Sequence, residues 1–403
     1  MHYKLAFAFL LASRLLLAQN DASAGSASRV AKSTEFAIPS SPAFNMLNGN
    51  TPSRIERYAS LHDVKVDWSL TNGQAGYTLS PGLGLEVQPV WMLFFDRAAA
   101  AKYRRAAPIV RTLSTLSLSA GTNGSNSRNW LAWAAKINLY RQHDPLNDPQ
   151  FLKEVERASK VKKDSLLKVV GGQYNQRHRL NKRDKDYKQQ YEGLSDTIET
   201  TLYNIRQAER EQGQRLVEAR EQYVSEHWNA SYLDFAFGRL LRYEQIKTVI
   251  AKTYESPTVP GQVDTVSFVT QNSLKLDQQG YGAWLSGGIG LGRHVMLSGM
   301  LRYAKKPSVL ADTIGQQLSF GTNFRYGSHR YNFFIETFYD QESYPLSEAP
   351  GLTLERKFFA LTVGGDWRIS HNVMLSFGIR RMKDLDTGTF LLQPMININC
   401  MMR

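Results

Sequence analysis

Residues 357–381 read KFFALTVGGDWRISHNVMLSFGIRR, and apolar residues alternate there with small or polar ones. Before a short break at residues 370–372, one face is formed by Phe359, Leu361, Val363, Gly365, Trp367 and Ile369. The opposite face takes Asp366 and Arg368, and Arg380 lies on the corresponding face after the break. A period of two is typical of β-strands. The stretch therefore predicts a hairpin with one apolar face and one charged face.

The same alternation recurs along most of the chain after residue 62. It predicts about twelve strands, including residues 64–70, 85–95, 111–122 and 130–140 and a series that begins at Tyr232. Most of them have about ten residues, the length that a tilted strand needs to cross a bilayer. Pro89 is unusual inside a strand because proline cannot donate to the ladder. A long polar loop is predicted at residues 243–279.

Alternation by itself fits two folds, a soluble sandwich with its apolar face inward and a membrane barrel with its apolar face toward lipid. The links favour the barrel. Short links at residues 291–294, 327–330 and 370–372 alternate with longer ones at 304–315, 341–354 and 383–388. Short turns at one end and long loops at the other are typical of outer-membrane barrels. We therefore predict an all-β transmembrane barrel of about twelve antiparallel strands with an inserted α-helical module.

The N-terminus predicts export. Residues 1–18, MHYKLAFAFLLASRLLLA, have the charge and apolar stretch of a signal peptide, with cleavage expected at Ala18-Gln19. A membrane anchor is the alternative, but the apolar stretch is short for one. Residues 19–61 would then be a periplasmic segment or a plug of the lumen. Their distinctive part is SPAFNMLNGNTPSRIERY at residues 41–58.

Composition excludes several classes of protein. The 403 residues include one cysteine, Cys400, so a disulfide framework within the chain and a CxxC metal site are both excluded. No apolar run reaches the roughly 18 residues of a transmembrane helix. The formal net charge is +13, but predicted export argues against nucleic acid as a partner. We expect no cofactor.

A helical insertion is predicted to divide the strands into two groups. Residues 62–142 would form the first four strands and residues 229–403 the remaining ones. Residues 143–228 would form the insertion, with helix breaks at Gly171-Gly172 and Gly193. Within the insertion, apolar residues recur at near-helical spacing at Leu194, Ile198, Leu202, Ile205 and Leu216.

The signal, the alternating hairpins, the near-absence of cysteine and the C-terminal strand make this chain similar to Gram-negative outer-membrane β-barrel proteins. The Ala18-Gln19 junction and residues 41–58 also resemble poorly characterised exported proteins of Bacteroidota. The resemblance implies a location in the outer membrane, with outer-membrane lipid around the barrel. If the C-terminus is periplasmic, counting the strands backward places the helical insertion in the periplasm.

Charged residues on the predicted polar face are the candidates for a functional lumen. They could select solutes in a narrow pore, or pair with one another and fill the barrel. Seven are basic and six are acidic, and this near-balance favours the paired network. The candidates are Lys65, Asp67, Glu86, Lys136, Asp234, Arg242, Arg302, Arg325, Glu336, Asp340, Asp366, Arg368 and Arg380.

The helical insertion offers a second candidate, the basic stretch RHRLNKRDKDYK at residues 177–188. It could bind an envelope protein or an anionic polymer, although a solvated surface is the simpler interpretation. Its basic residues are Arg177, Arg179, Lys182, Arg183, Lys185 and Lys188.

Catalysis is not predicted. Histidines such as His143, His178 and His371 fall in no HExxH, GxSxG or Walker pattern. An outer-membrane hydrolase is therefore the least favoured alternative. We expect a non-enzymatic component of the cell envelope that acts through its helical insertion, with a narrow pore for small solutes as the main alternative.

Overall fold

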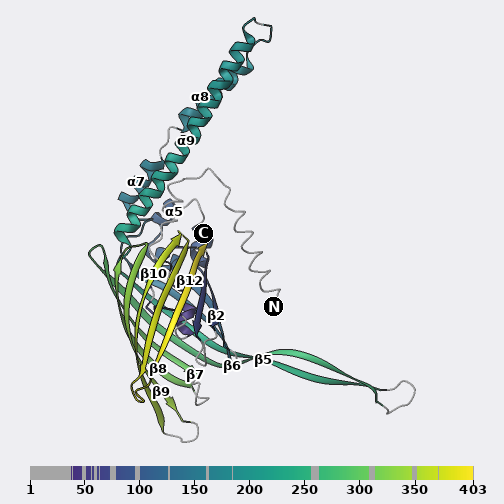
Figure 1. The fold of residues 1–403 in the computed structure, drawn as a ribbon, viewed down its shortest axis with the longest axis vertical. Helices are drawn as coiled ribbons and strands as arrows, with labels where there is room; N and C mark the ends of the chain where they lie inside the picture. The colour runs from purple at the N-terminus through teal and green to yellow at the C-terminus, as the bar shows by residue number, and fades with distance from the viewer. Residues whose placement is uncertain are drawn as a thin grey trace. The chain divides into compact units, whose positions relative to one another are not determined.

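The computed structural model contains a closed barrel of twelve antiparallel strands, shown in Figure 1. It describes residues 38–402 apart from 39, 48–50, 56, 59–60, 63, 73–78, 96–99, 126–127, 160–162, 184, 256–262, 308–313, 347–351 and 371. Each strand pairs with the next in the chain, and β1 pairs with β12 to close the barrel. The predicted fold class is confirmed. The predicted signal peptide lies outside the described residues.

The barrel strands are β1 (Val64–Asn72), β2 (Leu79–Val87), β3 (Ser117–Ser125), β4 (Arg128–Arg141), β5 (Tyr232–Glu255), β6 (Val263–Leu291), β7 (Val295–Pro307), β8 (Ile314–Gly327), β9 (Tyr331–Pro345), β10 (Thr353–Ser370), β11 (Val373–Asp384) and β12 (Phe390–Met402). In β10, Asp366 and Arg368 are buried inside the barrel, whereas Trp367 between them is exposed on the outer face. The strands therefore turn their charged face inward.

The outer face of the barrel is apolar around its circumference. Large side chains that are exposed there include Trp68, Leu83, Leu85, Leu118, Trp133, Phe235, Phe237, Leu285, Leu297, Leu301, Leu318, Phe320, Phe324, Phe333, Ile335, Leu361, Val363, Trp367, Ile379 and Ile396. Water-soluble folds bury such side chains. This distribution of polarity is the reverse of a soluble sandwich.

Two predicted strands differ from the structure. Residues 85–95 are strand only as far as Val87, and α4 (Pro89–Phe94) follows. Proline is well placed in the first turn of a helix, where its missing N–H costs no hydrogen bond, so Pro89 begins α4 and ends the strand. Residues 111–122 belong first to α6 (Pro108–Ser114) and then to β3. Another helix, α5 (Ala100–Arg105), lies between α4 and α6 in the sequence.

The predicted polar loop at residues 243–279 is wrong, because β5 and β6 continue through most of it as a two-stranded extension. The pairing runs from Tyr232 opposite Gly288 to Glu255 opposite Val263. Beyond Tyr243 no pairing with β4 is present in the described residues. The extension projects past the neighbouring strands in Figure 1.

The helical insertion contains α7 (Pro149–Ser159), α8 (Lys163–His178) and α9 (Tyr187–His227). The breaks predicted at Gly171-Gly172 and Gly193 are wrong, since α8 and α9 run through these glycines without interruption. Within the insertion, Phe151 of α7 stacks on Tyr223 of α9 with ring centroids 4.2 Å apart. No described helix is both long and apolar enough to span a bilayer.

The two ends of the barrel carry different connections. At one end, which we call the short-turn end, three turns of two or three residues join β6 to β7, β8 to β9 and β10 to β11. The C-terminal strand also ends there, since Val373 after the β10–β11 turn pairs with Cys400. Val64 pairs with both Val87 and Met402, so β1 begins and β2 ends at the same end. The chain leaves β4 and re-enters β5 at this same end, where Arg141 pairs with Tyr232. The helical insertion is therefore attached to the short-turn end.

Candidate functional site

The described residues between 38 and 62 occupy the lumen, and we call residues 38–62 the plug segment. Near the short-turn end, the Nδ2 amide of Asn399 donates to the carbonyl of Ile38 at 3.1 Å. Deeper in the barrel, Nη2 of Arg380 donates to the carbonyl of Thr51 at 2.9 Å. The segment then returns, and the backbone N–H of His62 donates to Gln88 at 2.8 Å, just outside β2. The plug segment is therefore a loop that enters and leaves by the short-turn end.

The first arm of the plug segment contains the helix α3 (Pro42–Met46), which packs against glycines of the wall. A Cβ atom at Gly84 would lie 3.1 Å from the Phe44 ring, and one at Gly121 would lie 3.2 Å from it. At Gly238 a Cβ would lie only 2.6 Å from Cγ of Met46. These wall positions are shaped to the helix, because a larger residue would force a shift at Gly84 and Gly238 and a tight contact at Gly121.

The apolar side chains of this arm build a core inside the barrel. Four plug residues, Ala43, Phe44, Met46 and Leu47, are buried there together with Ile55 of the second arm. The wall contributes small and large apolar side chains, namely Ala132, Ala134, Ala236, Leu240, Trp284, Met300, Phe338 and Ala360. The middle of the lumen is thus packed like the interior of a soluble domain rather than lined for water.

The second arm of the plug segment is held by carboxylates of β9. Glu336 accepts hydrogen bonds from the Ser53 hydroxyl at 2.6 Å, the Arg54 backbone N–H at 2.9 Å and the Ile55 backbone N–H at 3.3 Å. The Arg54 guanidinium pairs with Asp340 at 2.6 Å. Asp340 also accepts from Ser319. Both carboxylates are buried, so these contacts compensate the cost of removing them from water.

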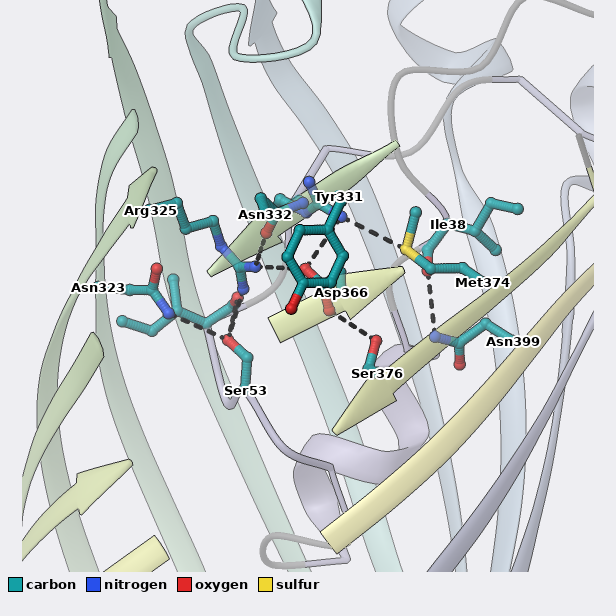
Figure 2. A network of polar contacts seen from close by, with 12 residues as sticks. Ile38, Ser53, Asn323, Arg325, Tyr331, Asn332, Asp366, Met374, Ser376 and Asn399 are labelled. Atoms are coloured by element: carbon teal, nitrogen blue, oxygen red, sulfur yellow. Dashed lines mark hydrogen bonds and ion pairs between the residues drawn. The ribbon is translucent and has the colours of Figure 1, made fainter. Parts of the chain in front are cut away.

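Arg325, Asp366 and Arg57 form a second buried charge group. Figure 2 shows Arg325 and Asp366 of this group. Arg325 of β8 pairs with Asp366 of β10, and it also donates to the Ser53 hydroxyl at 3.0 Å. Arg57 of the plug segment reaches the same carboxylate at 3.2 Å. Burial lowers the pKa of the Arg57 guanidinium to about 10, so Arg57 stays charged at neutral pH. One carboxylate is thus shared by an arginine of the wall and an arginine of the plug.

A third charge group lies where the plug segment meets β1 and β2. Lys65 pairs with Glu86, and the Lys65 ammonium lies 3.9 Å from Asp67. Asp67 accepts a hydrogen bond of 2.5 Å from the Ser41 backbone N–H, and His62 lies 3.7 Å from Glu86. Both ends of the plug segment therefore contact charges of the first hairpin.

Twelve of the thirteen residues predicted to face the lumen are buried: Lys65, Asp67, Glu86, Lys136, Asp234, Arg302, Arg325, Glu336, Asp340, Asp366, Arg368 and Arg380. Some bind the wall, as Asp234 does when it accepts from Asn138 at 2.6 Å. Others bind the plug segment, as Arg302 does when it donates to the Asn45 carbonyl at 2.6 Å. The side chain of Arg242 lies outside the described part of the chain.

The basic residues predicted in the helical insertion lie around the turn between α8 and α9. Arg179, Lys182, Arg183, Lys185 and Lys188 are exposed. Arg177 is half-buried, because its guanidinium lies over the rings of Tyr174 and Tyr191, at 4.9 and 5.3 Å from their centroids. They form a basic surface at one tip of the insertion, separate from the lumen network.

Reasoning from sequence missed the plug residues that complete the lumen network, chiefly Ser53, Arg54, Arg57 and His62. The signal that could have found them is the set of glycines on the polar face of the strands. Two glycines on that face contact the plug: a Cβ at Gly282 would lie 3.1 Å from Met46, and one at Gly378 would lie 3.4 Å from Pro52. The distinctive residues 41–58 are their counterpart.

The lumen offers little room for chemistry in this state. A small cavity remains between the plug segment and the wall, lined in part by Ser53, Arg57, Arg325 and Asp366. Among the described residues no group of three or more His, Cys, Asp or Glu side chains could hold a metal ion. The arrangement supports a filled lumen held together by hydrogen bonds and ion pairs.

No model of a known protein family and no curated protein matches this chain. Solved structures do. The KdgM porin matches at 8% identity over 84% of this chain and 99% of its own, with a TM-score of 0.33. The NanC porin matches at 7% identity over 84% and 99%, with a TM-score of 0.33. OmpT of Vibrio cholerae, expressed in the outer membrane, matches at 6% identity over 84% and 96%, with a TM-score of 0.25.

These structural neighbours are Gram-negative outer-membrane proteins. The similarity to exported proteins of Bacteroidota that residues 41–58 suggested is not among these matches. At such low identities and TM-scores, the likeness does not extend to what the neighbours bind or transport.

Proposed function

We propose that this protein is an outer-membrane β-barrel, closed by its own N-terminal segment, that holds its helical insertion in the cell envelope as a structural or assembly component. The observation that carries the proposal is the fit between the plug segment and the wall. Contacts reach the plug from every strand: for example, Ala43 binds Ser119 of β3, and Tyr58 lies under Arg141 of β4. A lumen packed in this way leaves no continuous path for water and ions, which a conducting pore requires.

The outer face supports a position in a membrane. Its exposed apolar side chains cover the circumference of the barrel, and such a surface would aggregate in water. Aromatic side chains flank this band. Tyr326, Tyr331 and Trp367 are exposed near the short-turn end, and Tyr281 and Tyr303 are exposed nearer the other end. Aromatic girdles at both interfaces are typical of outer-membrane barrels.

The helical insertion supports an assembly role over a simple pore. Its three helices extend over residues 149–227, and a barrel does not need them to close or to conduct. With the C-terminus periplasmic, the short-turn end and the attachment of the insertion face the periplasm. The exposed basic turn between α8 and α9 would then meet an envelope protein or an anionic polymer.

Deleting residues 150–226 tests the proposal, because the barrel keeps both flanking strands. The full-length protein and the deletion variant would be purified from outer membranes after mild cross-linking. We expect the deletion to leave the barrel folded, as judged by heat-dependent mobility on a gel, while the cross-linked partner is lost. The same cross-linked species with both proteins, or none with either, would contradict the assembly role.

A gated pore is the second candidate, and the path of the plug segment favours it. The segment enters and leaves by the same end, so it could withdraw toward that end without threading through the barrel. Planar-bilayer recordings test this directly. If the full-length protein does not conduct but a variant that lacks residues 38–61 does, the plug segment closes a pore. Steady openings of the full-length protein would instead establish a pore and overturn the closed state.

A further inference from the structure

The connection between β2 and β3 exposes large apolar side chains on two short helices, α4 and α6. In α4, Met92, Leu93 and Phe94 are exposed, Leu93 to 72%. In α6, Ile109 is exposed to 74%, and Val110 and Leu113 are exposed as well. Ile109 and Leu93 have the highest exposure among the large apolar side chains of the described residues. The helices α4 and α6 contact one another, so these side chains belong to one surface.

Helix α6 is amphipathic. Ile109 and Leu113 are four residues apart and share one face, because each residue advances about 100° around a helix. Arg111 lies on the opposite side and is only half-buried. The segment between α4 and α6, residues 95–107, contains four basic residues and one acidic residue in its sequence, Asp96. An exposed apolar face on a short helix close to basic residues in the sequence is typical of segments that lie in a membrane interface.

This surface continues the apolar outer face of the barrel. The strand before α4 exposes Leu85, and the strand after α6 exposes Leu118. The neighbouring end of β4, which α6 contacts, exposes Leu139 and Tyr140. No polar strip separates the lipid-facing band from the two helices along these strands. If lipid covers the apolar band of the barrel, the same lipid is expected to cover the exposed side chains of α4 and α6.

We propose that α4 and α6 form an interfacial anchor, embedded in the lipid leaflet at the short-turn end, with acyl chains against Leu93 and Ile109. This inference rests on the proposed membrane location of the barrel. The basic residues in the sequence of this connection would favour a membrane that contains anionic headgroups. The anchor fixes the depth of the short-turn end and hence of the site where the helical insertion is attached.

Nitroxide labels at single cysteines test the anchor. In a Cys400→Ser background, Leu93→Cys and Ile109→Cys would be labelled in full-length protein reconstituted into vesicles of zwitterionic and anionic phospholipid. Relaxation by oxygen, which concentrates in acyl chains, is compared with relaxation by a polar nickel chelate, which stays in water. Leu301→Cys on the outer wall and Glu199→Cys on α9 give the lipid and water references.

We expect the labels at residues 93 and 109 to follow Leu301→Cys, with oxygen the more effective relaxing agent. If Leu301→Cys reports lipid but these labels follow Glu199→Cys, the anchor is wrong and the membrane barrel stands. If Leu301→Cys itself reports water, the proposed membrane location fails. Protection from both reagents at residues 93 and 109 would indicate a protein contact and would also overturn the anchor.

Discussion

Glu336 shows at the scale of single residues how the lumen holds its plug. One buried carboxylate accepts three hydrogen bonds from the plug segment and one from Asn323 of the wall. Removing it leaves the donors of Ser53, Arg54 and Ile55 without that partner inside the barrel. Breaking a buried charged network by removing one member costs about 3–5 kcal/mol. The plug should therefore depend on this side chain more than on charges that bind only the wall.

Glu336→Ala is expected to release the plug segment. The assay is the rate at which a maleimide reagent labels Ala43→Cys, a fully buried plug position, in a Cys400→Ser background. We expect the rate to rise at least tenfold, since tenfold corresponds to about 1.4 kcal/mol. The control is Glu342→Ala, because Glu342 pairs with Lys306 of the wall at 2.5 Å. Equal rates in both variants would contradict the role of Glu336.

The glycine wall gives a second prediction at this scale. In Gly84→Val, the three atoms nearest the new Cβ belong to the plug, with Oγ of Ser41 at 2.8 Å and the Phe44 ring at 3.1 Å. Overpacking costs about 1–3 kcal/mol. We expect labelling of Ala43→Cys to accelerate about 5- to 150-fold, since each 1.4 kcal/mol corresponds to about tenfold. Gly299→Val is the control, because a Cβ there meets no plug atom.

A compensating change makes the glycine test specific. Phe44→Ala removes the ring that Gly84→Val would strike, so the double variant should label more slowly than the two separate effects predict. Coupled neighbours deviate from additivity by about 0.5–3 kcal/mol. Strict additivity of the two changes would show that the valine disturbs the wall and not the plug.

At the scale of elements, β5 and β6 change partners along their length. Residues 232–243 of β5 pair with both β4 and β6, whereas residues 244–255 pair only with β6. A two-stranded hairpin is marginally stable by itself, while strands within a closed sheet are protected on both sides. The same two strands thus contain a stable part and a weak part.

Hydrogen exchange should reveal this division. We expect amides at residues 244–255 and 263–276 to exchange far faster than those at residues 233–241 and 281–291 in reconstituted protein. The comparison is internal, since both classes belong to the same strands. Uniform protection along β5 and β6 would mean that another partner covers the extension.

Elements also show where the sequence pattern misleads. Residues 85–95 alternate as a strand would, yet α4 begins at Pro89. Alternation over so few residues cannot distinguish a strand from a short apolar helix that lies at the surface. The extension differs in the opposite sense, because its polar residues predict a loop but form strands. The extension lies beyond the part of β5 that pairs with β4, so the requirement that produces apolar alternation in the barrel wall does not act on it. Helix-breaking glycines misled for a similar reason, since α9 tolerates Gly193 at a modest cost.

At the scale of the whole molecule, removing the plug would leave a lumen of balanced charge. Among the described wall positions predicted from sequence, six are basic (Lys65, Lys136, Arg302, Arg325, Arg368 and Arg380) and six are acidic (Asp67, Glu86, Asp234, Glu336, Asp340 and Asp366). Selective pores carry rings of one sign of charge. The wall of this barrel does not have that arrangement.

A variant lacking residues 38–61 is therefore expected to conduct with weak ion selectivity. Under a salt gradient across a planar bilayer, its reversal potential should lie close to zero and far from the value for a single permeant ion. Glu336→Ala combined with the deletion should shift the potential toward anion preference, because one acidic group leaves a balanced set. A strongly selective deletion variant would contradict the charge balance.

The sequence predicted the wall of this molecule better than its contents. The period of two reports which residues face lipid, because that requirement acts on every strand in the same way, and it placed residues such as Asp366 and Arg380 inside. The plug contacts are specific pairings between distant parts of the chain, such as Ser53 with Glu336, and no local pattern encodes them. Glycines on the polar face of the wall, such as Gly84, Gly238 and Gly282, indicate where another segment packs closely, but they do not identify that segment.

The path of the plug segment has a consequence for the order of folding. This segment precedes β1 in the chain, and all twelve strands contact it, from Asp67 of β1 to Asn399 of β12. The last event in building the wall is the pairing of β1 with β12, which seals the sheet. An apolar helix such as α3 is more easily enclosed by a curling sheet than threaded into a finished one. The N-terminal segment would thus be enclosed while the wall assembles, so its entry need not follow the closure of the barrel.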